Sequence, residues 1–235
     1  MKSIILASTS TVYGGKPLEY LLKELEIHFK NTDHILFIPY ARPSGISYDL
    51  YTDKIKLPFN KIGKRVTGIH EFKNPTEAIQ QAKGIYVGGG NTFVLVNELY
   101  KNNCLHGLKE AISNGTPYLG TSAGSNICGL TMNTTNDMPI VYPPSFKTMG
   151  VVPFNINPHY LDPIKGGTHM GETRETRIKE FHQFNTQPVI GLREGSYIEV
   201  KGNDIALKGH LKARVFEYGK EAYELETNTF LNDLH

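Results

Sequence analysis

Short apolar runs alternate with amphipathic stretches through the first half of the chain. The apolar runs predict buried strands at Lys2–Ala7, His34–Ile38, Arg65–Ile69, Ile85–Val87 and Pro117–Thr121. The stretches between them predict helices at Pro17–Lys30, Tyr48–Asn60, Pro75–Ala82, Thr92–Lys101 and Leu105–Ser113. Strands and helices that alternate in this way predict an α/β fold, in which a mainly parallel sheet has helices on both faces.

The last third of the chain has a different pattern. Thr173–Phe184 is rich in charge and predicts a further helix. Short apolar runs follow at Val189–Leu192, Tyr197–Val200, Asp204–Leu207, Arg214–Tyr218 and Tyr223–Leu225. The pairs Gly202-Asn203 and Gly219-Lys220 are typical of turns, so we expect an antiparallel edge on the sheet. No linker or repeat divides the chain, and we expect residues 1–235 to form a single domain.

A candidate nucleophile follows the apolar run Pro117–Thr121. Gly120-Thr121-Ser122-Ala123-Gly124 is a Gly-x-Ser-x-Gly pattern between a predicted strand and a helix start. In such an elbow the serine hydroxyl stands above the sheet, and the next backbone N–H, here that of Ala123, points at an oxyanion. The pattern also occurs in ordinary turns. The strand that precedes it here is what favours a nucleophile.

A serine nucleophile needs a base and an acid that orients the base. His159 lies on a short loop, Asn157-Pro158-His159-Tyr160, after an apolar segment, and it is the first candidate base; His169 is the next. Asp137 falls between Ser122 and His159, which gives the Ser, acid, His order of hydrolases with this elbow. Glu194 ends an apolar strand, where active-site acids are also found. These residues alone leave the choice of acid open.

Composition and charge exclude several classes of protein. The net charge of +2 gives no reason to expect a nucleic acid or an anionic membrane as partner. The N-terminal apolar run is too short for a signal peptide. Cys104 and Cys128 are expected to be reduced thiols in a cytoplasmic protein. The chain has no His-Glu-x-x-His or Cys-x-x-Cys, and Gly88–Gly90 lacks nucleotide-binding spacing, so we expect neither a metal nor another cofactor.

Five separate segments together resemble the peptidase E family of α-aspartyl dipeptidases, from the first strand to about Val200. They are Val87-Gly88-Gly89-Gly90-Asn91-Thr92, Gly120-Thr121-Ser122-Ala123-Gly124-Ser125-Asn126, Thr134-Thr135-Asn136-Asp137-Met138-Pro139-Ile140-Val141, Ile156-Asn157-Pro158-His159 and Gly171-Glu172-Thr173-Arg174-Glu175. The resemblance implies a flavodoxin-like fold of the class I glutamine amidotransferase type. It also implies a serine peptidase mechanism and a small peptide substrate, a dipeptide with N-terminal aspartate.

The resemblance assigns a role to each candidate catalytic residue. It makes Ser122 the nucleophile and His159 the base. Asp137 matches the acid usually assigned to the charge relay, and Glu194 matches a second acid proposed for the same role. The two carboxylates therefore remain alternatives at this point.

The resemblance also implies binding residues. Gly90 matches an oxyanion-hole donor, and Arg174 matches the residue that holds the aspartyl carboxylate of the substrate. Arg177 lies three positions further on and would share the same helix face; alternatively, this face is only a solvated charged surface. Ser125 stands where alanine is common and Arg193 where proline is common, and the loop between His159 and Arg174 is slightly longer than the family pattern.

Three other functions compete with this interpretation. A cyanophycinase-like hydrolase would act on aspartyl polymers and would need a longer groove than the short loops here indicate. A generic esterase of the α/β-hydrolase class usually carries its histidine very late in the chain, unlike His159. A non-enzymatic binding protein would not need the complete set of serine, histidine and acid. For a small dipeptidase we expect no nucleic acid or membrane partner, and either a monomer or a homodimer.

Overall fold

The computed structural model describes residues 1–43, 45–163 and 171–234. Among these residues the main sheet has seven strands: β1 (Ser3–Ala7), β2 (His34–Ile38), β3 (Arg65–Gly68), β4 (Ile85–Val87), β5 (Tyr118–Thr121), β8 (Ser196–Lys201) and β9 (Asp204–Gly209). Their order is β3-β2-β4-β5-β1-β8-β9. The first five strands pair in parallel, and β8 and β9 add an antiparallel edge. The predicted α/β fold with a mainly parallel sheet is confirmed.

Helices cover both faces of this sheet because successive strand residues point to opposite sides. Ile5, Phe37 and Leu119 pack on one side with α1 (Leu22–His28) and α2 (Tyr48–Asn60). The other side packs against three helices: α3 (Pro75–Gln81), α4 (Thr92–Lys101) and α5 (Cys104–Ser113). Short 3₁₀ turns precede α1 at Glu19–Leu21 and follow β3 at Ile69–Glu71. The helix predicted at Pro17–Lys30 is therefore shorter than expected.

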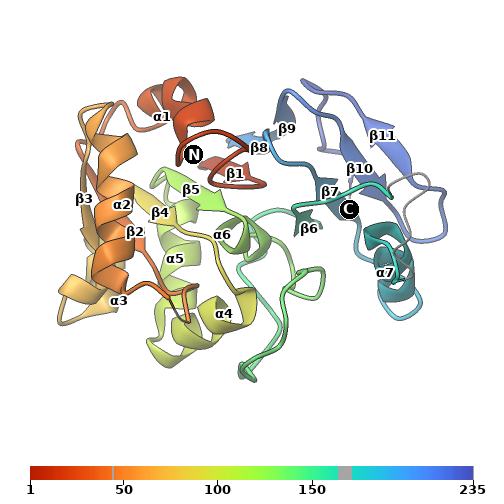
Figure 1. The fold of residues 1–235 in the computed structure, drawn as a ribbon, viewed down its shortest axis with the longest axis horizontal. Coiled ribbons are helices and arrows are strands. Elements are labelled where there is room, and N and C mark those ends of the chain that lie inside the picture. The colour runs from red at the N-terminus through yellow and green to blue at the C-terminus, as the bar shows by residue number, and fades with distance from the viewer. Residues whose placement is uncertain (44, 164–170, 235) are drawn as a thin grey trace.

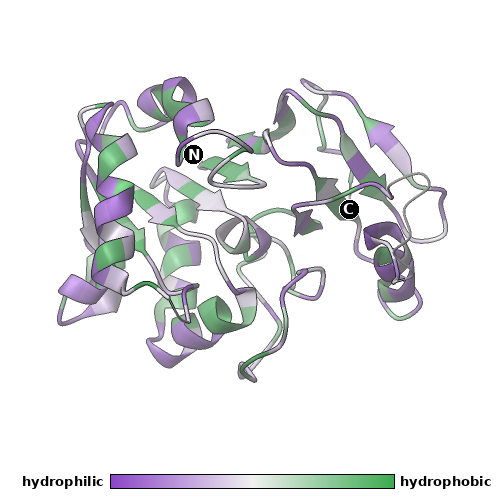
Figure 2. Cartoon of the chain, in the orientation of Figure 1, coloured by the Kyte–Doolittle hydropathy of each residue, from purple (hydrophilic) through white to green (hydrophobic). Residues whose placement is uncertain are grey.

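A second sheet and α7 (Arg174–Phe181) lie at one end of the molecule (Figure 1). Its strands are β6 (Asn155–Pro158), β7 (Val189–Leu192), β10 (Ala213–Phe216) and β11 (Tyr223–Leu225), in the order β11-β10-β7-β6. Strands β6 and β7 pair in parallel, and the remaining pairs are antiparallel. Helix α7 is polar over most of its surface (Figure 2) and buries Ile178 against this sheet.

This second sheet corrects one expectation. The C-terminal strands were all expected at the edge of one sheet, but only β8 and β9 extend the main sheet. The apolar segment that precedes His159 forms strand β6, and its parallel pairing with β7 starts a separate sheet. Ile156 and Ile190 still belong to the same hydrophobic cluster as Leu6 and Val87, so the core continues between the sheets.

The sheets bring four strand ends together. Gly90 follows β4, Ser122 follows β5, His159 follows β6 and Glu194 follows β7, each just beyond the carboxyl end of its strand. Ligands of open α/β sheets bind outside these ends. No helix in the described part of the chain combines the length and apolar character that crossing a bilayer requires.

Candidate active site

Ser122 occupies a strained turn between β5 and the short helix α6 (Ala123–Asn126). Its backbone has φ 53° and ψ −113°, a conformation that residues other than glycine rarely adopt. The Ser122 N–H donates to the carbonyl of Ala7, 3.1 Å away, which fixes the turn on β1. A Cβ at Gly120 would overlap the Gly124 carbonyl, and one at Gly124 would overlap Val87. The two glycines are therefore required by close backbone approach.

The His159 imidazole connects the serine to an acid. Its Nε2 lies 2.9 Å from the Ser122 Oγ, and its Nδ1 lies 2.6 Å from the Glu194 Oε1. Neither His159 nor Glu194 is deeply buried: 37% of the imidazole and 42% of the carboxylate side chain are exposed, which leaves the site open to a small molecule. His159 itself has a φ of 54°. The structure thus brings together Ser122, His159 and Glu194 in one hydrogen-bonded series.

Asp137 makes its hydrogen bonds elsewhere. Its Oδ2 accepts from the Thr92 N–H at 2.7 Å, from the Thr92 hydroxyl at 2.6 Å and from the Thr135 hydroxyl at 2.9 Å. Thr92 opens helix α4, two residues after Gly90. Of the two candidate acids, only Glu194 contacts the imidazole within the described part of the chain.

Ser8 holds the histidine loop in place, and sequence reasoning missed it. The buried Ser8 hydroxyl donates to the Leu192 carbonyl at 2.7 Å and accepts from the His159 N–H at 2.9 Å. It therefore bridges the ends of β6 and β7. A hydroxyl directly after β1, the strand next to the elbow strand, is the signal that would have pointed to it.

Arg193 joins the loops that carry His159 and Glu194. Its guanidinium donates two bonds to Asp162, both 2.8 Å, two to Glu224 at 2.8 and 2.9 Å, and one to the Lys212 carbonyl at 2.8 Å. These five bonds use all five donors of an arginine. It also lies 5.4 Å from the Tyr160 ring centroid. Hydrogen bonds to Glu224 and Asp162 raise the pKa of Arg193, so its guanidinium stays charged.

The loop after β4 lies against the nucleophile. A Cβ at Gly89 would come within 2.9 Å of the Ser122 Cβ, and Gly90 has a φ of 145° with no room for a side chain beside Ala41. Within the described residues, no carbonyl or side chain accepts a hydrogen bond from the N–H of Gly90 or Ala123. Both groups are available for an oxyanion.

Arg174 stands in the first turn of α7, behind the N-cap residue Thr173. Burial lowers the pKa of the half-buried guanidinium from its ordinary value. Arg177 lowers this pKa further, and Asp137 opposes both effects. Arg177 is exposed and, with Asp137, lines a cavity of about 440 Å³. The second candidate base, His169, lies outside the described residues, as does part of the loop between His159 and Arg174.

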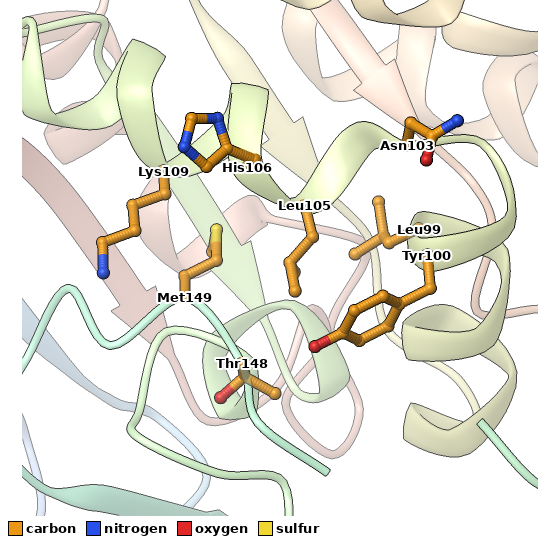
Figure 3. Close-up of a pocket in the computed structure, with 8 residues that line it drawn as sticks. All are labelled: Leu99, Tyr100, Asn103, Leu105, His106, Lys109, Thr148 and Met149. Carbon is orange, nitrogen blue, oxygen red and sulfur yellow. The ribbon is translucent and has the colours of Figure 1, made fainter. Parts of the chain in front are cut away.

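Another cavity, of about 420 Å³, lies between α4, α5 and the segment Thr148–Met149 (Figure 3). Leu99, Leu105 and Met149 give it largely apolar walls. None of the sequence-predicted catalytic residues lines it. The described residues contain no cluster of three or more His, Cys, Asp or Glu arranged to hold a metal ion.

Comparison with known proteins identifies the family. A sequence model of peptidase family S51 matches residues 4–208. The chain belongs to peptidase family S51. A protein named peptidase E from Streptomyces coelicolor is 42% identical over 232 residues, covering 99% of this chain and 94% of its own. A Drosophila melanogaster protein named "Probable alpha-aspartyl dipeptidase" is 42% identical over 219 residues, covering 92% and 90%.

A solved structure also shares the S51 chain's fold. The crystal structure of a peptidase from an acI-B1 actinobacterium superposes with a TM-score of 0.73 at 17% identity, covering 98% of this chain and 96% of that one. At this identity the likeness concerns the fold alone.

Proposed function

We propose that this member of family S51 is a serine dipeptidase that hydrolyses dipeptides with an N-terminal aspartate. The observation that carries the proposal is the series Ser122 Oγ, His159 Nε2 and Nδ1, and Glu194 Oε1, joined by contacts of 2.9 and 2.6 Å. The names of the 42% identical relatives support the substrate class.

The proposed reaction begins at Ser122. The Ser122 Oγ attacks the peptide carbonyl carbon while His159 Nε2 accepts its proton, and Glu194 accepts a hydrogen bond from the Nδ1–H. This bond selects the tautomer that leaves Nε2 free, and it stabilises the imidazolium. The N–H groups of Gly90 and Ala123 stabilise the oxyanion. His159 then protonates the departing amine, and an ester to Ser122 remains.

Water completes the cycle. His159 takes a proton from the water that attacks the ester, and the tetrahedral intermediate uses the same two N–H donors. Collapse of this intermediate returns the proton to Ser122 and releases aspartate. Each step is a proton or acyl transfer that the named side chains perform.

Arg174 is the proposed partner of the substrate's aspartyl carboxylate. A guanidinium offers a planar, two-pronged donor set that matches a carboxylate. Among the described residues, no hydrogen-bond acceptor pairs with the Arg174 guanidinium. The negative charge of Asp137 raises the pKa of Arg174, and Asp137 lines one cavity with Arg177 of the same helix.

The proposal extends to the location of the protein and to its domain organisation. We propose a cytoplasmic location, supported by Cys104 and Cys128, which are buried and unpaired. We also propose that residues 1–235 form one serine peptidase domain, supported by the hydrophobic cluster shared by both sheets. A monomer or a homodimer stays our expectation for the assembly.

The substrate class is tested with Asp-Leu and Asn-Leu as paired substrates. In Arg174→Ala, kcat/KM for Asp-Leu is expected to fall, because the substrate carboxylate loses its charged partner. The expected loss of transition-state stabilisation is about 2–5 kcal/mol. The slow hydrolysis of Asn-Leu should change far less. Arg177→Ala, one helical turn away, is the matched control and should keep the preference for Asp-Leu. Equal losses on the two substrates would show that Arg174 does not read the carboxylate.

A further inference from the structure

Asp137 is a charged group at the site that the catalytic series does not use. One of its oxygens, Oδ2, receives three hydrogen bonds from Thr92 and Thr135. No described residue donates a hydrogen bond to Oδ1. The carboxylate is therefore held rigidly by one oxygen, at the N-terminus of α4, while its second oxygen is left without a protein donor.

The residues around Asp137 tie it to both catalytic loops. Asn91, next to Gly90, donates its side-chain N–H to the Met138 carbonyl at 2.9 Å. On the other side, the Asn136 side chain donates to the Pro158 carbonyl at 2.7 Å, directly before His159. Asp137 thus stands between the oxyanion loop and the base loop, and it shares a cavity with Arg177 of α7.

The substrate has a group that such a carboxylate would recognise. A dipeptide carries its α-ammonium on the carbon beside the carbonyl that Ser122 attacks. In an aspartyl residue the nitrogen and the side-chain carboxyl carbon are three bonds apart, so their partners on the enzyme must be neighbours of opposite charge. Asp137 and Arg174 carry such opposite charges: Asp137 lines one cavity with Arg177 of helix α7, the helix that carries Arg174, and its negative charge raises the pKa of Arg174.

We propose that Oδ1 of Asp137 accepts a hydrogen bond from the α-ammonium of the substrate, opposite the guanidinium of Arg174. This inference rests on the proposed function and makes Asp137 a binding residue rather than the acid of the catalytic series. Because Thr92 connects Asp137 to the loop of Gly90, the ammonium contact also sets the carbonyl oxygen toward the oxyanion donors. The same contact restricts hydrolysis to peptides with a free amino terminus.

Succinyl-leucine tests this assignment because it equals Asp-Leu with the α-ammonium replaced by hydrogen. In Asp137→Asn, kcat/KM for Asp-Leu is expected to fall by about 30-fold or more, mainly through KM, since the ammonium loses a charged acceptor. The lower kcat/KM for succinyl-leucine should stay within about threefold of wild type. Glu194→Gln is the matched carboxylate control. It should lower kcat/KM by the same factor for Asp-Leu and for succinyl-leucine.

Binding to a Ser122→Ala protein gives a readout independent of turnover. Calorimetry should show that Asp137→Asn weakens Asp-Leu binding strongly and succinyl-leucine binding little. Equal losses on the two ligands, in turnover or in binding, would overturn the assignment, because Asp137 would then act on the loops and not on the ammonium. Failure of the proposed function is a different result: wild-type protein that binds Asp-Leu through Asp137 without hydrolysing it.

Discussion

At the level of single residues, His159 is held by three contacts. Its backbone N–H donates to the Ser8 hydroxyl, its Nδ1 contacts Glu194, and its Nε2 contacts the Ser122 hydroxyl. A base held in this way needs no rearrangement before it takes the serine proton, which is the sense in which such sites are preorganised. Arg193 extends the support, since its ion pair with Asp162 joins the two loops that carry the base and its acid.

Glu194→Gln tests the assignment of the acid. An amide can present its N–H to Nδ1 and so stabilise the wrong tautomer, with the proton on Nε2. We expect kcat for Asp-Leu to fall by about 10²–10⁴-fold with a small change in KM. Steady-state kinetics on purified, folded protein provide the measurement. Turnover close to wild type would assign the orienting role to another group.

The sequence identified the serine and the histidine but not the acid. Ser122 is marked by the local spacing of two glycines, and His159 by the loop after an apolar segment. Asp137 has the Ser, acid, His order in its favour and Glu194 its place at the end of an apolar strand, and neither signal outweighs the other. The distinction depends on which strand lies beside β6, and that neighbour is β7, which carries Glu194. Strand pairing across 35 positions is not readable from residue spacing.

At the level of elements, parallel pairing explains why the site lies where it does. The ends of β4 and β5 carry Gly90 and Ser122, and the ends of β6 and β7 carry His159 and Glu194. In each pair the strands run in the same direction, so their following loops emerge at the same edge. Periodicity predicted β1, β2 and β4 closely, because each is a short run that is buried along almost all of its length.

Helix α1 carries a titratable group on the far side of the sheet. His28, in its last turn, donates from Nε2 to the Tyr118 carbonyl at 3.1 Å. Burial lowers the pKa of this imidazole from 6.5 to about 4, although the bond to Tyr118 opposes the shift. Between these two pH values the unfolded chain binds a proton that the folded chain does not, so acid destabilises the fold in this range.

His28→Gln should remove this acid sensitivity while keeping a side-chain donor for the carbonyl. Unfolding by urea at pH 7.5 and pH 4.5 measures the effect. From pH 7.5 to pH 4.5, the free energy of unfolding of wild type is expected to fall by about 2 kcal/mol more than that of the variant. Only wild type has an imidazole at position 28 that stays neutral in the folded state and binds a proton on unfolding. At pH 7.5 the shift contributes nothing. The same pH dependence in both proteins would rule out His28 as the source.

At the level of the whole molecule, the second sheet is what the sequence did not predict. The apolar segment before His159 reads as buried, but its role as a strand depends on β7, more than 30 positions later. The C-terminal strands resemble one another in length and pattern, so periodicity cannot tell β8 and β9 from β10 and β11. The two sheets nevertheless share one hydrophobic cluster, and α7 packs on the second sheet through Ile178.

The central claim is that Ser122 hydrolyses Asp-Xaa dipeptides, and Ser122→Ala tests it most directly. The measurement is kcat for Asp-Leu with wild type, Ser122→Ala and the matched control Ser125→Ala, all checked for folding by thermal melting. Wild type should release aspartate and leucine. In Ser122→Ala, kcat should fall by roughly 10⁴–10⁶-fold, whereas Ser125→Ala should keep most of the wild-type kcat. Comparable hydrolysis by folded Ser122→Ala protein would contradict the account.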